Sequence, residues 1–175
     1  MLAVAALVLA LVGGTPREID VAASKASFSV AHVWVERVSG SVPIRRGSVT
    51  LAPGSLVPTS VTAELDATRI RTDEPDRDAA LESPDFFDAA KYPVWTFVSR
   101  NVTPEGPTSF TMDGDLTIHG VTRPERLNVT IGGGDAHPVY HATATVDRHA
   151  FGMATTRLDP TIGSSVDVRL DIVVR

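Results

Sequence analysis

The sequence predicts an all-β protein: one domain of about eight antiparallel strands, interrupted by a single short helical excursion. From Ile19 onward apolar and polar residues alternate with a period of two, and turn signals separate the alternating stretches. The chain has 175 residues and no cysteine, so it is long enough to bury a sizeable core and has no disulfide. The hydrophobic core must therefore hold the fold together.

The N-terminal residues 1–14 differ from the rest of the chain and are predicted to be a signal peptide. Residues 2–12 are uninterrupted Leu, Ala and Val, a stretch shorter than the ~20 residues of a membrane-spanning helix. Val12 and Gly14 suit the −3 and −1 positions of a cleavage site, which leaves residues 15–175 as the mature domain. No basic residue precedes the apolar stretch, so an uncleaved anchor or a misassigned start codon stays open. We expect an exported protein, periplasmic or secreted.

The predicted strands cover most of the remaining chain. They are residues 28–35, 40–51, 61–65, 94–100, 110–118, 127–131, 140–146 and 166–174, with 19–22 as a short addition. The last strand is the clearest, because its apolar residues alternate with Asp167, Arg169 and Asp171. Turns such as Pro53-Gly54 and His119-Gly120 separate the strands. Evenly spaced antiparallel strands make a sandwich or a barrel, and the pattern alone does not choose between them.

Residues 73–91 form the one segment that reads as helical. Asp73 is expected to cap a turn with Pro75 near its start, and Ser83 is expected to cap a second short helix. Tyr92-Pro93 ends the segment, because the residue before proline is pushed out of the helical region. The excursion carries Phe86 and Phe87, which are expected to be either a plug at one end of the core or a lid over a ligand mouth.

The histidines offer no catalytic or metal-binding constellation. His137 and His141 are four residues apart, a separation of ~13 Å on a strand, which is too far for one ion. His119 and His149 are expected at the surface or in turns. His32 shares the inward face of Phe28, where it would bond to backbone or contact a ligand head group. No nucleophile-elbow, phosphate-loop or zinc-protease motif is present, so we expect neither an enzyme nor a cofactor.

The charge of the chain argues against nucleic acid as a partner. The net charge is −5, the isoelectric point is about 5.5, and no run of basic residues occurs. Monomer and homodimer both stay open, as does transient contact with a membrane.

Five segments in order resemble the YceI-like family of small secreted, lipocalin-like barrels that hold polyisoprenoid lipids. They are FSVAHVWVERVSGSV at 28–42, AELDATRIRTDEPDRDAAL at 63–81, SPDFFDAAKYPVWTF at 83–97, GDLTIHGVTRP at 114–124 and FGM at 151–153. The resemblance implies an eight-stranded antiparallel lipocalin-like β-barrel. It also implies that Asp78, beside Arg77, orders the helical excursion and the barrel rim.

The inward positions favour a hollow interior. Ala63, Gly114, Ala142 and Ala144 are small, which either leaves room for a ligand or fits the taper of a packed barrel. The candidate cavity walls are Phe28, His32, Trp34, Phe86, Phe87, Trp95, Phe97, Phe110, Leu116 and Phe151.

The resulting prediction is binding, storage or transport of a polyisoprenoid or similar amphiphilic lipid, with an isoprenoid lipid or quinone as the bound ligand. The main alternative is a structural or stress-related interaction protein with a packed barrel and no ligand. A metal-dependent enzyme is the less favoured alternative.

Overall fold

The computed structural model describes residues 14–32, 36–134, 136–153 and 159–175. The predicted signal segment therefore lies outside the described residues, apart from Gly14. The strands are β1 Thr15–Glu18, β2 Lys25–His32, β3 Glu36–Ser41, β4 Ile44–Leu51, β5 Pro58–Asp66, β6 Val94–Gly106, β7 Ser109–Ile118, β8 Val121–Gly134, β9 His137–Asp147 and β10 Ile162–Val173. The helical elements are the 3₁₀ turns η1 Ala67–Arg69, η2 Arg148–Phe151 and η3 Asp159–Thr161 and the α-helix α1 Pro75–Glu82.

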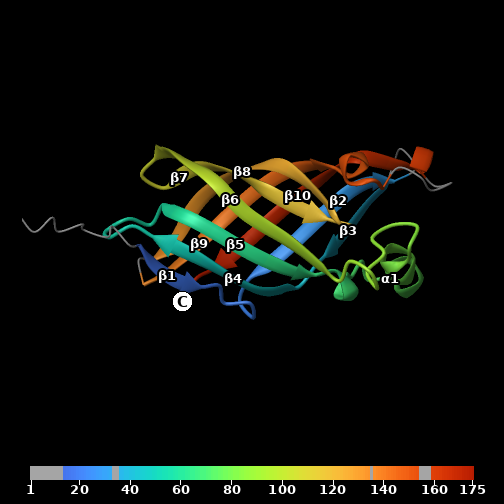
Figure 1. Cartoon of the computed structure of the whole chain (residues 1–175), viewed down its shortest axis with the longest axis horizontal. Helices are drawn as coiled ribbons and strands as arrows, with labels where there is room; N and C mark the ends of the chain where they lie inside the picture. Colours follow the sequence, from blue (N-terminus) through green and yellow to red (C-terminus); the bar gives the residue numbers. More distant parts are fainter. Residues whose placement is uncertain (1–13, 33–35, 135, 154–158) are drawn as a thin grey trace, which may run out of the picture.

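The strands form one antiparallel sheet in the order β1-β4-β5-β6-β7-β8-β9-β10-β2-β3. The sheet curls around an interior until the residues after β1 meet the end of β10 (Figure 1). Ile19 bridges Val174, and the Asp20 amide donates to the Val173 carbonyl at 2.8 Å. The Arg175 amide donates to the Glu18 carbonyl at 3.0 Å. These bonds join the two sides of the curled sheet into the predicted antiparallel, lipocalin-like barrel.

The strand count differs from the predicted eight, because two of the long strands of the barrel are interrupted. In the 10-stranded sheet, β1 and β2 are the two parts of one interrupted strand, and β3 and β4 are the two parts of the other. The predicted strand 40–51 is interrupted at Val42-Pro43, where proline has no amide hydrogen for the ladder. The predicted short strand at 19–22 lies instead at Thr15–Glu18.

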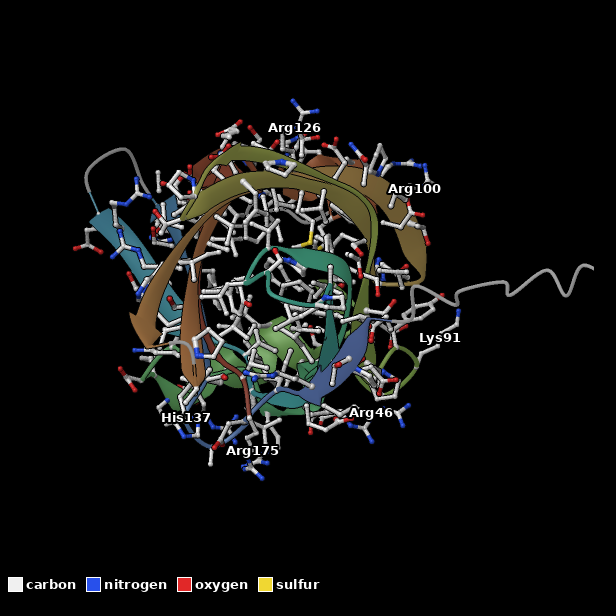
Figure 2. The ribbon with its side chains drawn as sticks, turned by 90° about the vertical axis from the view of Figure 1, so that its left-hand side faces the viewer. Arg46, Lys91, Arg100, Arg126, His137 and Arg175 are labelled. Carbon is white, nitrogen blue, oxygen red and sulfur yellow. The ribbon has the colours of Figure 1, made fainter. Side chains whose placement is uncertain are left out.

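The predicted alternation is confirmed in the burial of the strands. In β7, Phe110, Met112, Gly114 and Ile118 are buried, and in β9 every second residue from Pro138 to Val146 is buried. Charged side chains such as Arg46, Arg100 and Arg126 project outward around the ring of strands (Figure 2, viewed from the end opposite α1). The apolar faces therefore enclose the interior of the barrel.

The helical excursion differs from the prediction in its caps. Glu74, not Asp73, occupies the N-cap of α1 and makes no capping bond, while Asp73 has a positive φ of 61°. Pro75 is at the first helical position, as predicted. No second helix begins at Ser83: its hydroxyl donates to the Ala80 carbonyl at 2.7 Å, so it serves the end of α1. Residues 84–91 continue in turns.

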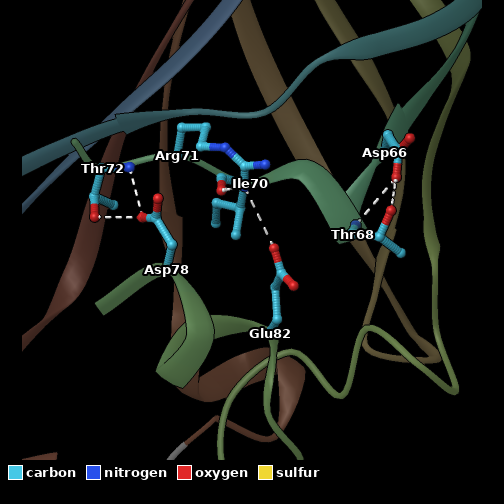
Figure 3. Close-up of polar contacts among 7 residues, drawn as sticks. All are labelled: Asp66, Thr68, Ile70, Arg71, Thr72, Asp78 and Glu82. Carbon is cyan, nitrogen blue, oxygen red and sulfur yellow. Dashed lines mark hydrogen bonds and ion pairs between the residues drawn. The ribbon is translucent and has the colours of Figure 1, made fainter. Parts of the chain in front are cut away.

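Asp78 ties α1 to the barrel rim, as the family resemblance implied. It is buried, and its Oδ1 accepts from the Thr72 amide at 2.7 Å and from the Thr72 hydroxyl at 2.6 Å (Figure 3). Arg77 donates from Nε to the same hydroxyl at 2.8 Å and from Nη2 to the Thr72 carbonyl at 3.0 Å. Thr72, in the segment between η1 and α1, is thus bound by both Arg77 and Asp78, and α1 is fixed at one end of the barrel.

None of the helices within the described ranges is long and apolar enough to span a membrane.

Candidate ligand-binding cavity

The interior of the barrel contains a cavity of about 450 Å³. Its walls come from β2–β10 and α1, and most of the lining side chains are aliphatic or aromatic. The volume lies within the ~300–1,000 Å³ of typical small-molecule sites. The barrel is therefore not filled by its own side chains.

Eight of the predicted wall residues line this cavity. They are Phe28, His32, Phe86, Phe87, Trp95, Phe97, Phe110 and Leu116. Trp34 lies outside the described residues. Contact between any of these side chains and a ligand stays a prediction.

Phe151 was predicted as a cavity wall, and the structure places it elsewhere. It is fully buried in the hydrophobic cluster that includes Ile70 and Val146 and is not among the lining residues. The 3₁₀ turn η2 carries it off the strand ladder, and Gly152 then turns the chain in the left-handed conformation. A pattern of alternation does not reveal this departure.

The small inward residues were expected either to leave room for a ligand or to fit a packed barrel, and each interpretation holds for some of them. Ala63, Ala142 and Ala144 line the cavity and leave it open. At Gly114 the space is taken by the Phe97 ring, since a Cβ there would lie 2.3 Å from Phe97 Cζ. Gly114 therefore allows close packing of β6 and β7 and does not widen the cavity.

Phe86 and Phe87 are both half-buried and both line the cavity near α1. Phe87 packs on the Trp95 ring, with the ring centroids 4.6 Å apart. The Trp95 indole nitrogen is buried and has no hydrogen-bond partner among the described residues. The excursion therefore contributes to the wall of the cavity and also packs against β6.

Polar side chains that the sequence analysis did not assign to the cavity also line it. Glu125, Arg148 and Arg77 are among the lining residues, together with His32. Glu125 has the inward parity of Leu127 and Val129 on β8, so the alternation could have identified it. Burial raises the pKa of the Glu125 carboxyl, and the negative charge of Asp147 raises it further.

Arg148 is buried and holds the segment that follows η2. Its Nε donates to the Gly163 carbonyl at 2.9 Å, its Nη2 donates to the Ile162 carbonyl at 2.8 Å, and its Nη1 donates to the Met153 carbonyl. The guanidinium thus binds three backbone oxygens.

The other histidines lie apart from one another and from the cavity lining. His141 pairs with Asp171 at 2.6 Å on the outer surface, and His119 lies in a turn against the Phe151 carbonyl at 3.3 Å. His137 is exposed at the start of β9, and His149 lies in η2. No group of three or more His, Asp or Glu residues within the described ranges is arranged to hold a metal ion.

The comparison with known families agrees with this architecture. The model of the YceI-like domain matches residues 18–174, nearly the whole described chain. The chain belongs to the YceI-like family.

Curated relatives of this YceI-like chain are bacterial proteins named UPF0312. One from Vibrio parahaemolyticus is 31% identical over 154 residues, which cover 83% of this chain and 78% of the relative. One from Pseudomonas savastanoi pv. phaseolicola is 29% identical over 132 residues, which cover 72% of this chain and 69% of the relative.

Solved structures share the YceI-like fold. BcnA from Burkholderia cenocepacia superposes with a TM-score of 0.82 at 22% identity, covering 90% of this chain and 99% of BcnA. A polyisoprenoid binding domain from Saccharophagus degradans, implicated in plant cell wall breakdown, superposes with a TM-score of 0.73 at 13% identity. That match covers 91% of this chain and 97% of the domain. At these identities the similarity shows a common fold.

Proposed function

We propose that this YceI-like protein binds a polyisoprenoid or similar amphiphilic lipid inside the barrel and carries or stores it without catalysis. The observation that supports this most directly is the cavity of about 450 Å³ with mainly apolar walls. The polyisoprenoid binding domain from Saccharophagus degradans shares the fold, which favours the same class of ligand here.

The energetics suit a reversible carrier. Each CH₂ removed from water gains ~0.8 kcal/mol, so a long isoprenoid would gain more than ~20 kcal/mol in gross terms. Non-covalent complexes do not exceed about 18–21 kcal/mol of net affinity. The competing location of such a lipid is a bilayer, however, and the hydrophobic term largely cancels between two hydrocarbon environments. Loading and release therefore depend on the shape of the cavity and on the head group.

The proposal includes export. The apolar residues 2–12 and the small residues Val12 and Gly14 support a cleaved signal peptide. N-terminal sequencing of the protein from its native host should begin at Thr15, whereas a sequence that begins at Met1 would count against cleavage.

The ligand is tested by organic extraction and mass spectrometry of the protein from its native host, with native mass spectrometry of the intact complex. A polyprenyl compound in near-stoichiometric amount is expected. A protein that yields no lipid from either measurement favours the packed interaction protein.

Two cavity-filling variants test where the lipid lies. Ala144→Leu and Ala63→Leu each add volume to the lining and are expected to reduce the extracted lipid several-fold. Thr143→Leu is the control, because Thr143 is exposed on the outer face of β9. Near-ultraviolet circular dichroism checks that each variant is folded. Folded variants with an unchanged lipid content would place the ligand outside this cavity.

A further inference from the structure

The charged side chains of the cavity and His32 lie at one end of the barrel. Arg77 belongs to α1, Arg148 begins η2, and His32 ends β2 beside Ile162. Glu125 is close to the β7–β8 hairpin at the same end, where Arg123 Nε donates to the Ala150 carbonyl of η2 at 3.0 Å. The cavity is therefore polar on the side of α1 and η2.

The opposite end of the cavity is apolar. Ile19, Val49 and Ile172 line it. The Tyr140 hydroxyl, the polar group there, donates to the Leu56 carbonyl at 2.7 Å. Among the described residues, a lipid tail would meet no unsatisfied buried polar group at this end, so an amphiphile would lie with its head towards α1.

The two cations at the polar end are held by oxygens of the chain itself. Arg148 donates from all three guanidinium nitrogens to backbone carbonyls. Arg77 donates from two of its nitrogens to Thr72. Neither side chain presents the open guanidinium fork that binds a phosphate with two parallel hydrogen bonds.

Glu125 is different, because its carboxyl makes no hydrogen bond or ion pair with any residue that the structure describes. It is half-buried in the wall. It lies two residues before the buried Leu127 on β8 and pairs with Gly114 of β7. A carboxyl group that is partly removed from water without a partner is destabilising, and a hydrogen-bond donor on a ligand would relieve this cost.

We propose that Glu125 is the head-group residue of this cavity and accepts a hydrogen bond from the hydroxyl group of an uncharged head group. The inference rests on the proposed lipid binding and adds the orientation and class of the ligand. A phosphate or carboxylate head would bring negative charge towards Glu125 and Asp147. A cationic head would meet Arg77 and Arg148. A neutral alcohol or phenol avoids both repulsions.

The test compares four isoprenoids that carry the same tail: the alcohol, its methyl ether, the primary amine and the diphosphate. Dissociation constants are measured by calorimetry with delipidated wild-type protein. We expect the alcohol to bind about 3- to 10-fold more tightly than the ether, which is the effect of one net hydrogen bond. The diphosphate and the amine should bind more weakly than the alcohol.

The variant Glu125→Leu removes the acceptor and puts an apolar side chain of similar size in its place. It should bind the alcohol and the ether equally, while its affinity for the ether stays within about 2-fold of wild type or rises. Asn128→Leu, on the outer face of the same strand, should keep the wild-type preference. Glu125→Gln, which keeps a carbonyl acceptor, should retain most of the preference for the alcohol and provides a second folded variant.

The outcomes separate the two proposals. A wild-type preference for the diphosphate or the amine, or an unchanged alcohol-to-ether ratio in Glu125→Leu, would overturn the role of Glu125 while lipid binding stands. Failure of all four isoprenoids to bind wild-type protein would overturn lipid binding itself, and the role of Glu125 with it.

Discussion

The Phe87 ring lies 4.6 Å from the Trp95 ring, centroid to centroid, and the two planes are inclined at 53°. Phe87 belongs to the turns that follow α1, whereas Trp95 is at the start of β6 and pairs with Leu65 of β5. The contact therefore holds the excursion on the wall of the barrel. Phe86 lines the same cavity but stacks on no aromatic ring among the described residues.

This difference predicts separate roles for the two phenylalanines. Phe87→Ala removes the contact with Trp95 and should lower the free energy of unfolding by about 2 kcal/mol, less than a fully buried phenylalanine loses. Phe86→Ala should cost less than about 1 kcal/mol and should release bound lipid faster. Urea unfolding and the rate of lipid transfer to vesicles measure the two effects. Unchanged lipid retention with lowered stability in Phe86→Ala would instead identify it as part of the plug.

Gly114 is expected to tolerate no larger side chain. A Cβ at this position would lie 2.3 Å from Phe97 Cζ and 2.7 Å from the Val98 carbonyl oxygen. Gly114→Ala should therefore lower the unfolding free energy by about 1–3 kcal/mol, as overpacking does. Gly134→Ala is the control, since a Cβ there meets no atom within 4 Å. Equal stability of the two variants in urea would contradict the close packing of Phe97 on β7.

Asp78 is predicted to stabilise the rim more than a carboxylate on the same helix that faces solvent. Asp78→Ala leaves the Thr72 amide and hydroxyl without their acceptor and should cost about 1–3 kcal/mol. Asp76→Ala, in the exposed first turn of α1, should change stability by less than about 0.5 kcal/mol. Thermal unfolding compares the two variants, and similar midpoints would show that the bonds to Thr72 contribute little.

The pair of Asp20 and Arg175 at the barrel closure should make stability depend on acid. The Arg175 hydrogen bond, opposed by desolvation of the carboxyl, is the main cause that lowers the pKa of Asp20 from 3.8 to about 2. Because the folded state lowers this pKa, the stabilisation is complete above about pH 4 and is lost as the pH falls towards 2.

Asp20→Asn and Arg175→Gln should each remove this contribution. The difference in unfolding free energy between wild type and either variant, measured in urea, should shrink between pH 4 and pH 2. A difference that stays constant over this range would show that the ion pair does not stabilise the closure. Arg175 is exposed and Asp20 is partly exposed, so added salt should also weaken the pair.

Much of the fold was predicted from the local alternation of apolar and polar residues. This alternation correctly predicted the inward faces of β7 and β9, and it placed His32 on the inward side of β2. The same alternation indicates that Glu125 faces inward, although Glu125 was not among the predicted wall residues. The role of Asp78 in ordering the rim followed from the family resemblance, whereas its partner Thr72 was identified only in the structure.

Other features depended on contacts between distant parts of the chain. Phe151 leaves the cavity wall because η2 turns away from the ladder and places its ring in the cluster with Ile70 and Val146. The breaks in the two barrel strands depended on pairing over long sequence separations, because β1 pairs with β4 whereas β2 pairs with β10 and β3. Neither local propensity nor residue spacing encodes these choices.

By itself, the sequence determined which side chains face inward, because the direction of a side chain on a strand is a local property with a period of two. Only the tertiary structure decided whether the interior is empty. Phe97 fills the space over Gly114, yet Ala63, Ala142 and Ala144 leave theirs open. The volume between facing walls depends on the curvature of the whole sheet and on side chains from strands far apart in sequence, so no single segment specifies it.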